Sequence, residues 1–272
     1  MKTLQQFTIF ALLCLQSLAF GQENKLENIK QKYDPLLNEQ HKGVAILVKQ
    51  ENAITIKSLG NFNLNAHNVF NIGSATKTFT AILFMQEMER GNLQLTDSIG
   101  TYLKPIKNVS SSITLQQLLT HESGLGEIIG ENLEDIFYAK KDSLYNHNLL
   151  NHVGENNPKM IGKFDYCNTN YFLLGRIIEK ITDQSYFDLL RERIIKPLEM
   201  SNTYPYVNRN LPNLATPYHN GKDVTAYLDY KYFANIAYAA GSIASTLSDM
   251  EIFYTSLFET EKLLKKETVK QM

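Results

Sequence analysis

The chain of 272 residues contains no tryptophan and only two cysteines, Cys14 and Cys167. Its 27 lysines and arginines nearly balance its 28 aspartates and glutamates, and the sequence carries neither a basic patch nor a run of one charge sign. We therefore expect no nucleic-acid partner. Internal repeats and low-complexity tracts are also missing, whereas a hydrophobic content of 43% is enough for a substantial buried core.

Sequence patterns that are typical of metal sites are missing as well. His147 and His152 lie five residues apart, which is the wrong spacing for one face of a helix. His121-Glu122 lacks the second histidine of an H-E-x-x-H motif. We expect neither a metal nor another cofactor. A G-x-S-x-G motif is also lacking, which argues against the α/β-hydrolase fold.

Residues 1–21 have the pattern of a secretory signal peptide, with Lys2, an apolar run over residues 7–15 and an Ala-Phe-Gly cleavage site at residues 19–21. The run is short for a membrane span. We expect a periplasmic or secreted protein with no stable membrane insertion after cleavage; an uncleaved N-terminal anchor is the alternative. Cleavage would leave only Cys167, which excludes an intramolecular disulfide and suggests a thiol that is at least partly buried.

The motif S-x-x-K at Ser74 and Lys77 precedes an apolar helical stretch. If Ser74 opens that helix, the two side chains lie on one face, and the Lys77 amine can reach the Ser74 hydroxyl. A serine hydroxyl needs a nearby base to become a good nucleophile, and a lysine can serve if burial lowers its pKa. The alternative for an isolated match is an N-capping serine followed by a surface lysine.

A second candidate element is the tripeptide Tyr166-Cys167-Asn168. A tyrosine near the lysine can act as a base or proton relay, and an asparagine amide can hold a substrate carbonyl and orient the lysine. The alternative is a turn ahead of a helix, because asparagine and threonine are common in turns and caps.

These motifs, together with four other segments in the same order, resemble the serine β-lactamase-related hydrolases, the branch with class C β-lactamases, D-alanyl-D-alanine carboxypeptidases and related esterases. The resemblance runs from about residue 42 to residue 272. The matching segments are residues 70–81 (FNIGSATKTFTA), 91–97 (GNLQLTD), 113–125 (ITLQQLLTHESGL), 166–168 with the helix after them, 196–200 (KPLEM) and 239–242 (AAGS).

The resemblance implies a role for each motif residue. Ser74 would be the acylated nucleophile, Lys77 and Tyr166 would share the tasks of base and proton shuttle, and Asn168 would bind and orient the substrate. Cys167 departs from the serine that is usual at this position in the family. His121 would belong to a structural segment that ends a helix and turns at Gly124.

The third motif of the family, K-T-G or H-x-G on a late strand, has no counterpart at the expected place. Residues 219–221 spell H-N-G, but they precede residues 239–242, so we interpret them as a loop turn. The sequence is therefore expected to be a fragment or a truncated homologue. If residue 272 is the natural end, an unstable or nearly inactive protein is expected, because an isolated hairpin is marginal and one lost oxyanion donor costs about 10²–10³ in rate.

Local patterns predict the main elements. Strands are expected at residues 43–48 and 53–58, an amphipathic helix at residues 23–39, and turns over residues 207–240. Helix starts are expected at Thr114, Asn170, Ser185 and Ser248.

The predicted fold is α/β (α+β): an antiparallel sheet flanked by helices, with an inserted helical subdomain, of the β-lactamase/transpeptidase type and without its C-terminal strands. We expect one domain over residues 22–272 after the signal peptide. Residues 22–96 would form the first part of the sheet subdomain with the nucleophile helix, residues 97–206 a mostly helical subdomain, and residues 207–272 an incomplete return to the sheet.

Two functions remain open. The first is an exported serine hydrolase that works through an acyl-enzyme on Ser74 and takes a small-molecule or peptide substrate: a cell-wall peptide, a β-lactam or a small ester. The second is a catalytically degenerate envelope protein that binds peptidoglycan-type peptides. A monomer is expected in either case.

Overall fold

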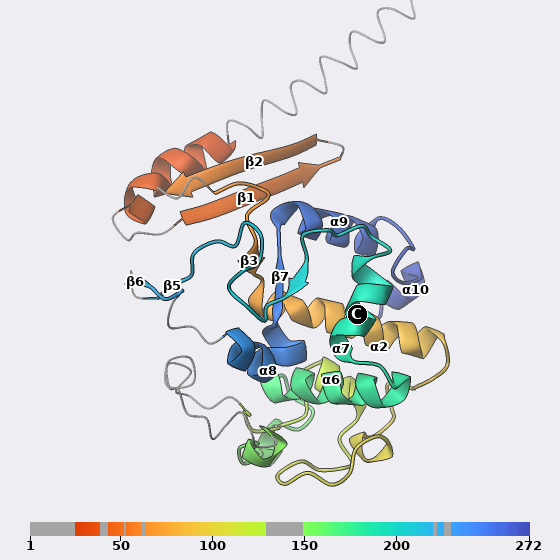
Figure 1. The fold of residues 1–272 in the computed structure, drawn as a ribbon. Helices are drawn as coiled ribbons and strands as arrows, with labels where there is room; N and C mark the ends of the chain where they lie inside the picture. The colour runs from red at the N-terminus through yellow and green to blue at the C-terminus, as the bar shows by residue number, and fades with distance from the viewer. Residues whose placement is uncertain are drawn as a thin grey trace, which may run out of the picture. The chain divides into compact units, whose positions relative to one another are not determined.

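The computed structural model describes residues 25–38, 43–51, 53–60, 64–128, 149–219, 222–225 and 230–272. The predicted signal peptide, residues 1–21, lies outside these ranges. The chain divides into two compact units, one made of residues 1–68 and 215–223 and the other of residues 69–214 and 224–272. The elements are labelled in Figure 1.

The first unit contains the predicted hairpin, β1 (Gly43–Gln50) paired antiparallel with β2 (Ala53–Gly60). Each strand runs two residues beyond its predicted end, and the helix predicted over residues 23–39 is confirmed over residues 25–38. This helix packs on the hairpin, because Lys30 Nζ donates to the Ser58 carbonyl at 3.1 Å and the Gly60 N–H donates to Asp34 at 2.7 Å.

A second, very short hairpin in the same unit pairs β5 (Tyr218–His219) with β6 (Lys222–Asp223). The predicted turn at residues 219–221 falls here. Its first residue ends β5, and residues 220–221 lie outside the described residues.

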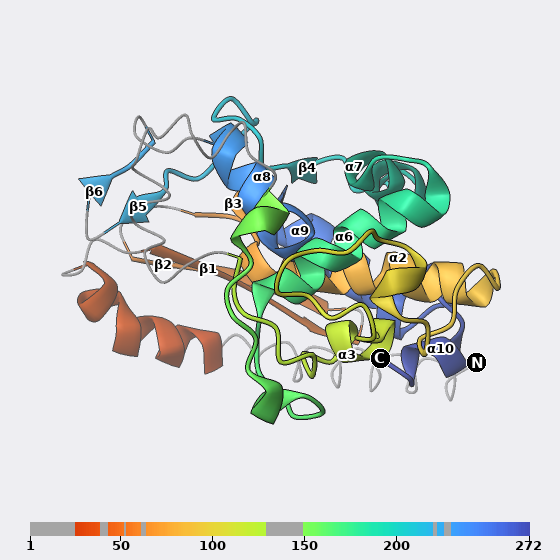
Figure 2. The same ribbon diagram turned by 90° about the horizontal axis from the view of Figure 1, so that it is seen from below.

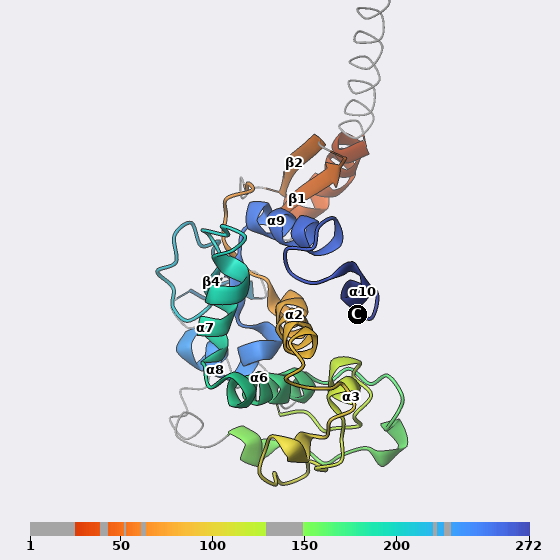
Figure 3. The same cartoon turned by 90° about the vertical axis from the view of Figure 1, so that its right-hand side faces the viewer.

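The second unit is organised around helix α2 (Thr76–Glu89). Ten of its fourteen residues are buried, including Phe79, Ile82 and Phe84. A helix that is buried on most of its sides must be enclosed by other elements. Figure 3 looks nearly along α2 and shows its neighbours arranged around it. They include α6 (Asn168–Thr182), α7 (Tyr186–Leu190), α8 (Tyr230–Gly241), α9 (Leu247–Phe258) and α10 (Lys266–Val269).

A small antiparallel sheet in this unit has the strand order β3-β7-β4. Its strands are β3 (Phe70–Asn71), β7 (Ile243–Ser245) and β4 (Tyr204–Pro205). The sequence did not predict them, because strands of two or three residues are too short to show a period of two. The central strand β7 is buried and brings the segment before α2 next to the segment after α8.

The predicted cap at Thr114 is confirmed by a capping box at the start of α3 (Leu115–Leu119), and Ser185 caps α7 through the Asp188 N–H at 3.2 Å. Two predicted helix starts are wrong. Asn170 lies inside α6, where it is fully buried and bonded to another side chain, and α9 is capped by Thr246 rather than by Ser248.

Two regional predictions also need correction. Residues 97–206 are less helical than expected, since the described parts between η2 (Ile99–Thr101), α3, η3 (Leu149–His152) and η4 (Pro158–Met160) are irregular. Residues 207–240 were expected to be turns, yet α8 begins at Tyr230. The prolines and the Asn-Gly pair that suggested turns all precede this helix.

The general fold class, a mixture of helices and small antiparallel sheets, is confirmed. Figure 2 shows α6 running beside α2, as in Figure 1.

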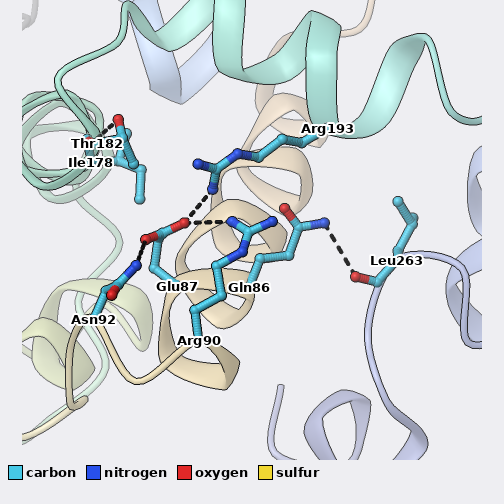
Figure 4. A network of polar contacts seen from close by, with 8 residues as sticks. All are labelled: Gln86, Glu87, Arg90, Asn92, Ile178, Thr182, Arg193 and Leu263. Carbon is cyan, nitrogen blue, oxygen red and sulfur yellow. Dashed lines mark hydrogen bonds and ion pairs between the residues drawn. The ribbon is translucent and has the colours of Figure 1, made fainter.

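A buried carboxylate connects α2 to the π-helical turn η5 (Arg191–Ile195), as shown in Figure 4. Glu87 is 1% exposed and accepts hydrogen bonds from Asn92 at 2.6 Å, from Arg90 at 2.5 Å, and from Arg193. Burial disfavours the charged carboxylate, but these three donors outweigh that effect and hold the pKa of Glu87 below its usual value.

Candidate active site

Ser74 lies in the 3₁₀ turn η1 (Gly73–Ala75), directly before α2. Gly73 adopts a φ of +51°, a backbone conformation that favours glycine, and its N–H donates to Asn71 Oδ1 at 2.8 Å. The turn leaves Ser74 exposed, while Lys77, in the first turn of α2, is only 7% exposed. The expected geometry, with both side chains on one face, is therefore present.

The Lys77 amine is held by three acceptors. Its Nζ atom lies 3.2 Å from Ser74 Oγ, 2.9 Å from Asn168 Oδ1 and 2.8 Å from the carbonyl oxygen of Ala240. An ammonium has three donors, so this arrangement uses all of them. Burial nevertheless lowers the pKa of Lys77, because the charged form loses its hydration.

Tyr166 also contacts Ser74, Asn168 and Lys77. Its hydroxyl oxygen lies 2.7 Å from Ser74 Oγ and 3.5 Å from Asn168 Oδ1. Its ring centroid is 4.9 Å from Lys77 Nζ, a distance at which a cation is attracted to the ring face. The structure thus brings together all four side chains that the sequence singled out: Ser74, Lys77, Tyr166 and Asn168.

A carboxylate that the sequence did not single out orients Asn168. Glu127 Oε1 accepts from the backbone N–H of Asn168 at 2.7 Å and from its side-chain Nδ2 at 3.2 Å. The second bond turns the amide so that its oxygen faces Lys77. The first satisfies a free N–H at the start of α6, where a negative charge is also favourable. Glu127 lies 41 positions before Asn168, and no local pattern marks it.

The carbonyl that holds Lys77 comes from a break in α8. Tyr238 has a non-helical backbone conformation (φ 36°, ψ −125°). After this break the Ala239 carbonyl accepts from Thr80 Oγ1 at 2.7 Å, and the Ala240 carbonyl accepts from Lys77. Two successive carbonyls are therefore aimed at α2. Sequence reasoning missed this contact, because a backbone acceptor has no side-chain signature.

Two further residues lie beside the group. Cys167 is 3% exposed, as expected, and its Sγ lies 3.6 Å from the Gly126 carbonyl; burial raises the pKa of the thiol. His121 does lie in a turn after α3, but it was expected only to support that turn. Its ring also stacks on Tyr166, with centroids 4.6 Å apart.

A cavity of about 480 Å³ borders Lys77, His121 and Tyr171. It is lined mainly by α2, α3 and the end of the chain, and Ser74 is not among its lining residues. Within the ranges that the structure covers, no group of three or more His, Cys, Asp and Glu side chains is arranged to hold a metal ion. In those same ranges, no helix is both long and apolar enough to cross a membrane.

Comparisons with known proteins agree with this fold. The family model described as Beta-lactamase matches residues 27–272. The protein PbpX of Bacillus subtilis is 28% identical over 240 residues, which cover 85% of this chain and only 58% of PbpX. The structure of a D-stereospecific amidohydrolase from Streptomyces sp. is 25% identical, with a TM-score of 0.73, and the match covers 89% of this chain and 76% of that one. D-amino acid amidase from Ochrobactrum anthropi is 24% identical, with a TM-score of 0.74 and coverage of 90% and 74%.

Proposed function

Because this chain belongs to the Beta-lactamase family, we propose that it is a serine hydrolase that cleaves amide bonds through an acyl-enzyme on Ser74. One observation carries the proposal: Ser74 Oγ lies 2.7 Å from the hydroxyl of Tyr166 and 3.2 Å from the amine of Lys77. A serine with two potential proton acceptors in hydrogen-bond reach has the arrangement that nucleophilic catalysis requires.

In the first half of the reaction, Ser74 Oγ attacks the carbonyl carbon of the substrate while its proton passes to Tyr166 or Lys77. The tetrahedral intermediate then collapses, the C–N bond breaks, and the amine leaves with the returned proton. The product is an ester between the acyl group and Ser74. In the second half, water attacks this ester and releases the acid and the free serine. Proton transfer of this kind contributes about 10²–10⁴ in rate.

The other contacts prepare Lys77 for this role. Burial lowers its pKa and so increases the fraction of neutral amine, which alone can accept a proton. Asn168 holds the amine at 2.9 Å, and Glu127 fixes the orientation of Asn168. We assign Asn168 a further role as a donor to the substrate carbonyl.

For the substrate, we favour amides of D-amino acids over other candidates, because solved structures similar to this chain include a D-stereospecific amidohydrolase and a D-amino acid amidase. Cell-wall peptides that end in D-alanine share this chemistry. β-Lactams and small esters are alternative substrates of the same acyl-enzyme mechanism. Turnover of D-phenylalanine amide, its L-enantiomer, nitrocefin and a p-nitrophenyl ester would rank these classes.

The test of the mechanism is acylation of Ser74. The purified protein is incubated with a fluorophosphonate probe and analysed by intact mass and peptide mapping. We expect one adduct on Ser74, no adduct in S74A, and an unchanged adduct in S201A, a control at an exposed serine. Labelling of S74A to the same extent as wild type would refute the assignment.

A binding protein without catalysis is the second candidate, because Ser74, Lys77 and Asn168 can also hold a peptide by hydrogen bonds without cleaving it. In that case a stem peptide that ends in D-alanyl-D-alanine would bind without an adduct and without release of D-alanine. Calorimetry together with intact mass on one sample separates the two functions.

Export and a monomeric state belong to the same proposal. The leader-like pattern of residues 1–21 supports export to the periplasm or the medium. A mature N-terminus at Gln22 in the exported fraction is expected, and an intact N-terminus in the membrane fraction would instead indicate an anchor. Light scattering would test the monomer.

A further inference from the structure

His121 is bonded to both neighbours of Tyr166 in the sequence. Its carbonyl oxygen accepts from the Asp165 N–H at 2.8 Å, and its ring Nδ1 accepts from the Cys167 N–H at 3.2 Å. Tyr166 itself is 46% exposed, so close packing does not fix its position. The backbone on both sides of Tyr166 is instead held by this one residue.

The imidazole ring makes a third contact to the same segment. It stacks on the Tyr166 ring at a centroid distance of 4.6 Å and an interplanar angle of 29°. Tyr171 lies against it at 5.2 Å, and Phe164 meets it edge-on at 5.9 Å. With only 7% of His121 exposed, the ring has one well-defined orientation between these aromatic side chains.

The hydrogen bonds of Nδ1 define the tautomer. Besides the Cys167 N–H, the Asn170 Nδ2 lies 3.1 Å from Nδ1. The Asn170 oxygen accepts from Ser123 Oγ at 2.5 Å, which turns the amide so that its NH₂ group faces His121. Two donors point at Nδ1, so this nitrogen carries no proton and the proton of the neutral ring is on Nε2.

A protonated ring would not fit this arrangement, because its Nδ1–H would face two other N–H donors. The ionisable groups that face the ring are Lys77 on α2, Tyr166 before α6 and Tyr171 within α6. Burial and the charge of Lys77 both lower the pKa of His121. The geometry thus favours the neutral ring, and a proton on Nδ1 would break the hydrogen bonds from the Cys167 N–H and from Asn170.

We propose that His121, in its Nε2–H tautomer, is a positioning residue that holds Tyr166 against Ser74. The inference rests on the proposed function, because it concerns how fast Ser74 is acylated. The contact between Tyr166 and Ser74 at 2.7 Å depends on where the tyrosine backbone and ring are held, and His121 holds both. Acidification should therefore slow acylation through His121 as well as through Lys77.

Two substitutions and one control test this proposal. H121A removes both the Nδ1 acceptor and the stacked ring. H121N keeps an acceptor oxygen near the position of Nδ1 and suits the φ of +58° at this residue, because asparagine tolerates the left-handed region. H152N changes an exposed histidine outside the site.

The rate of Ser74 acylation by the fluorophosphonate probe is measured from pH 4.5 to pH 9. A misplacement of about 1 Å costs about 10²-fold, so H121A is expected to acylate about 10²-fold more slowly than wild type. H121N should be acylated at least tenfold faster than H121A. The pH profile of H121N should lack the ionisation of His121 on its acid limb. H152N should match wild type throughout. If H121A does not fold, H121N tests the proposal by itself, because its acylation rate should show no ionisation of His121 at acid pH.

A second readout does not depend on catalysis. Nitrogen-15 spectra of labelled histidine should show Nδ1 of His121 unprotonated at pH 7, and substitution H121N should shift the ring resonances of Tyr166. A proton on Nδ1, or acylation of H121A within threefold of wild type, would overturn the proposal. If folded wild-type protein forms no adduct, the proposed function fails, and the spectra still decide whether His121 holds Tyr166.

Discussion

The amine of Lys77 donates to the carbonyl oxygen of Ala240 at 2.8 Å, across 163 positions of the sequence. This bond joins the first turn of α2 to the end of α8, and it leaves the amine 3.2 Å from the Ser74 hydroxyl. A lysine side chain is flexible, so its position depends on such fixed acceptors. The break in α8 at Tyr238 is therefore part of the candidate active site.

The first prediction concerns the charge of Lys77. Substitution K77R puts a guanidinium in its place, which stays charged at all accessible pH values and cannot accept a proton. We expect the rate of Ser74 acylation to fall by about 10²–10⁴. K196R, at an exposed lysine, should behave as wild type.

The pH dependence of wild type follows from the same residue. The pKa of Lys77 is below its ordinary value, and in the proposed mechanism the neutral amine accepts the Ser74 proton, so the acylation rate should rise with pH and level off above that pKa. A rate that is independent of pH from 5 to 9 would contradict a role of Lys77 as the base.

The second prediction concerns Gly175, where α6 meets the break in α8. A Cβ at this position would lie 2.4 Å from Tyr238 Cε1 and 2.6 Å from the Ala239 Cβ. Substitution G175A should therefore push α8 away from α6 and cost about 1–3 kcal/mol of unfolding free energy. It should also slow acylation, because the Ala240 carbonyl moves with α8.

Urea unfolding and the acylation rate are measured on G175A beside K180A, an exposed position of the same helix. If G175A has the stability and the acylation rate of wild type, α8 accommodates the added methyl group without moving the Ala240 carbonyl. A loss of stability with an unchanged acylation rate would show that the contact between α6 and α8 does not influence the candidate active site.

The third prediction concerns the buried Glu87. Replacing it with glutamine removes the charge that faces Arg90 and Arg193. Breaking a fully buried ion pair costs about 3–5 kcal/mol, and because the Arg90 and Arg193 side chains are 47% and 20% exposed, we expect a smaller loss of about 1–3 kcal/mol. D188N, which breaks an exposed pair with Arg191, should cost less than about 1 kcal/mol. Unfolding free energies from urea titrations at pH 7 provide the comparison.

The sign of the pH effect on Glu87 is fixed by the direction of its shift. Its pKa is lowered in the folded state, so its contribution is complete above the unfolded value of about 4.3 and is lost as pH falls through the folded pKa. The difference between wild type and E87Q should therefore shrink in acid. A difference that stays constant down to pH 3 would show that Glu87 acts by packing alone.

The sequence singled out those side chains of the candidate site that lie at short, regular spacing. Ser74 and Lys77 lie on one helical turn, and Tyr166 and Asn168 are separated by one residue, so each pair was visible as a motif. That these two pairs lie together in the folded chain was expected only from the family resemblance. The Ala240 carbonyl, Glu127 and the contact of His121 with Tyr166 were missed, since each depends on tertiary structure that leaves no local pattern.

The same distinction applies to the fold. The hairpin of β1 and β2 has strands of eight residues and a short polar turn, and it was predicted closely. The strands β3, β4 and β7 are two or three residues long and depend on partners far away in the chain. The start of α6 was misplaced by two residues, because its first N–H is capped by distant Glu127 rather than by a nearby side chain.

The last prediction concerns the thiol that lies between Tyr166 and Asn168. Cys167 is buried, its Sγ lies 3.6 Å from the Gly126 carbonyl, and burial raises the pKa of the thiol, so very little thiolate forms at pH 8. The thiolate is the reactive form. We expect iodoacetamide to leave Cys167 unmodified in the folded protein at pH 8 and to modify it fully in 6 M guanidinium.

Substitution C167S tests whether the sulfur itself matters to the site. A serine hydroxyl in the same place can donate to the Gly126 carbonyl, so unfolding free energy should change by about 1 kcal/mol or less and the acylation rate by less than threefold. Because Cys167 also donates its backbone N–H to His121, a distorted backbone in C167S would slow acylation and move the His121 signals together. Rapid alkylation of folded wild type would instead show that the segment carrying Tyr166 opens readily, which is incompatible with a Tyr166 held firmly against Ser74.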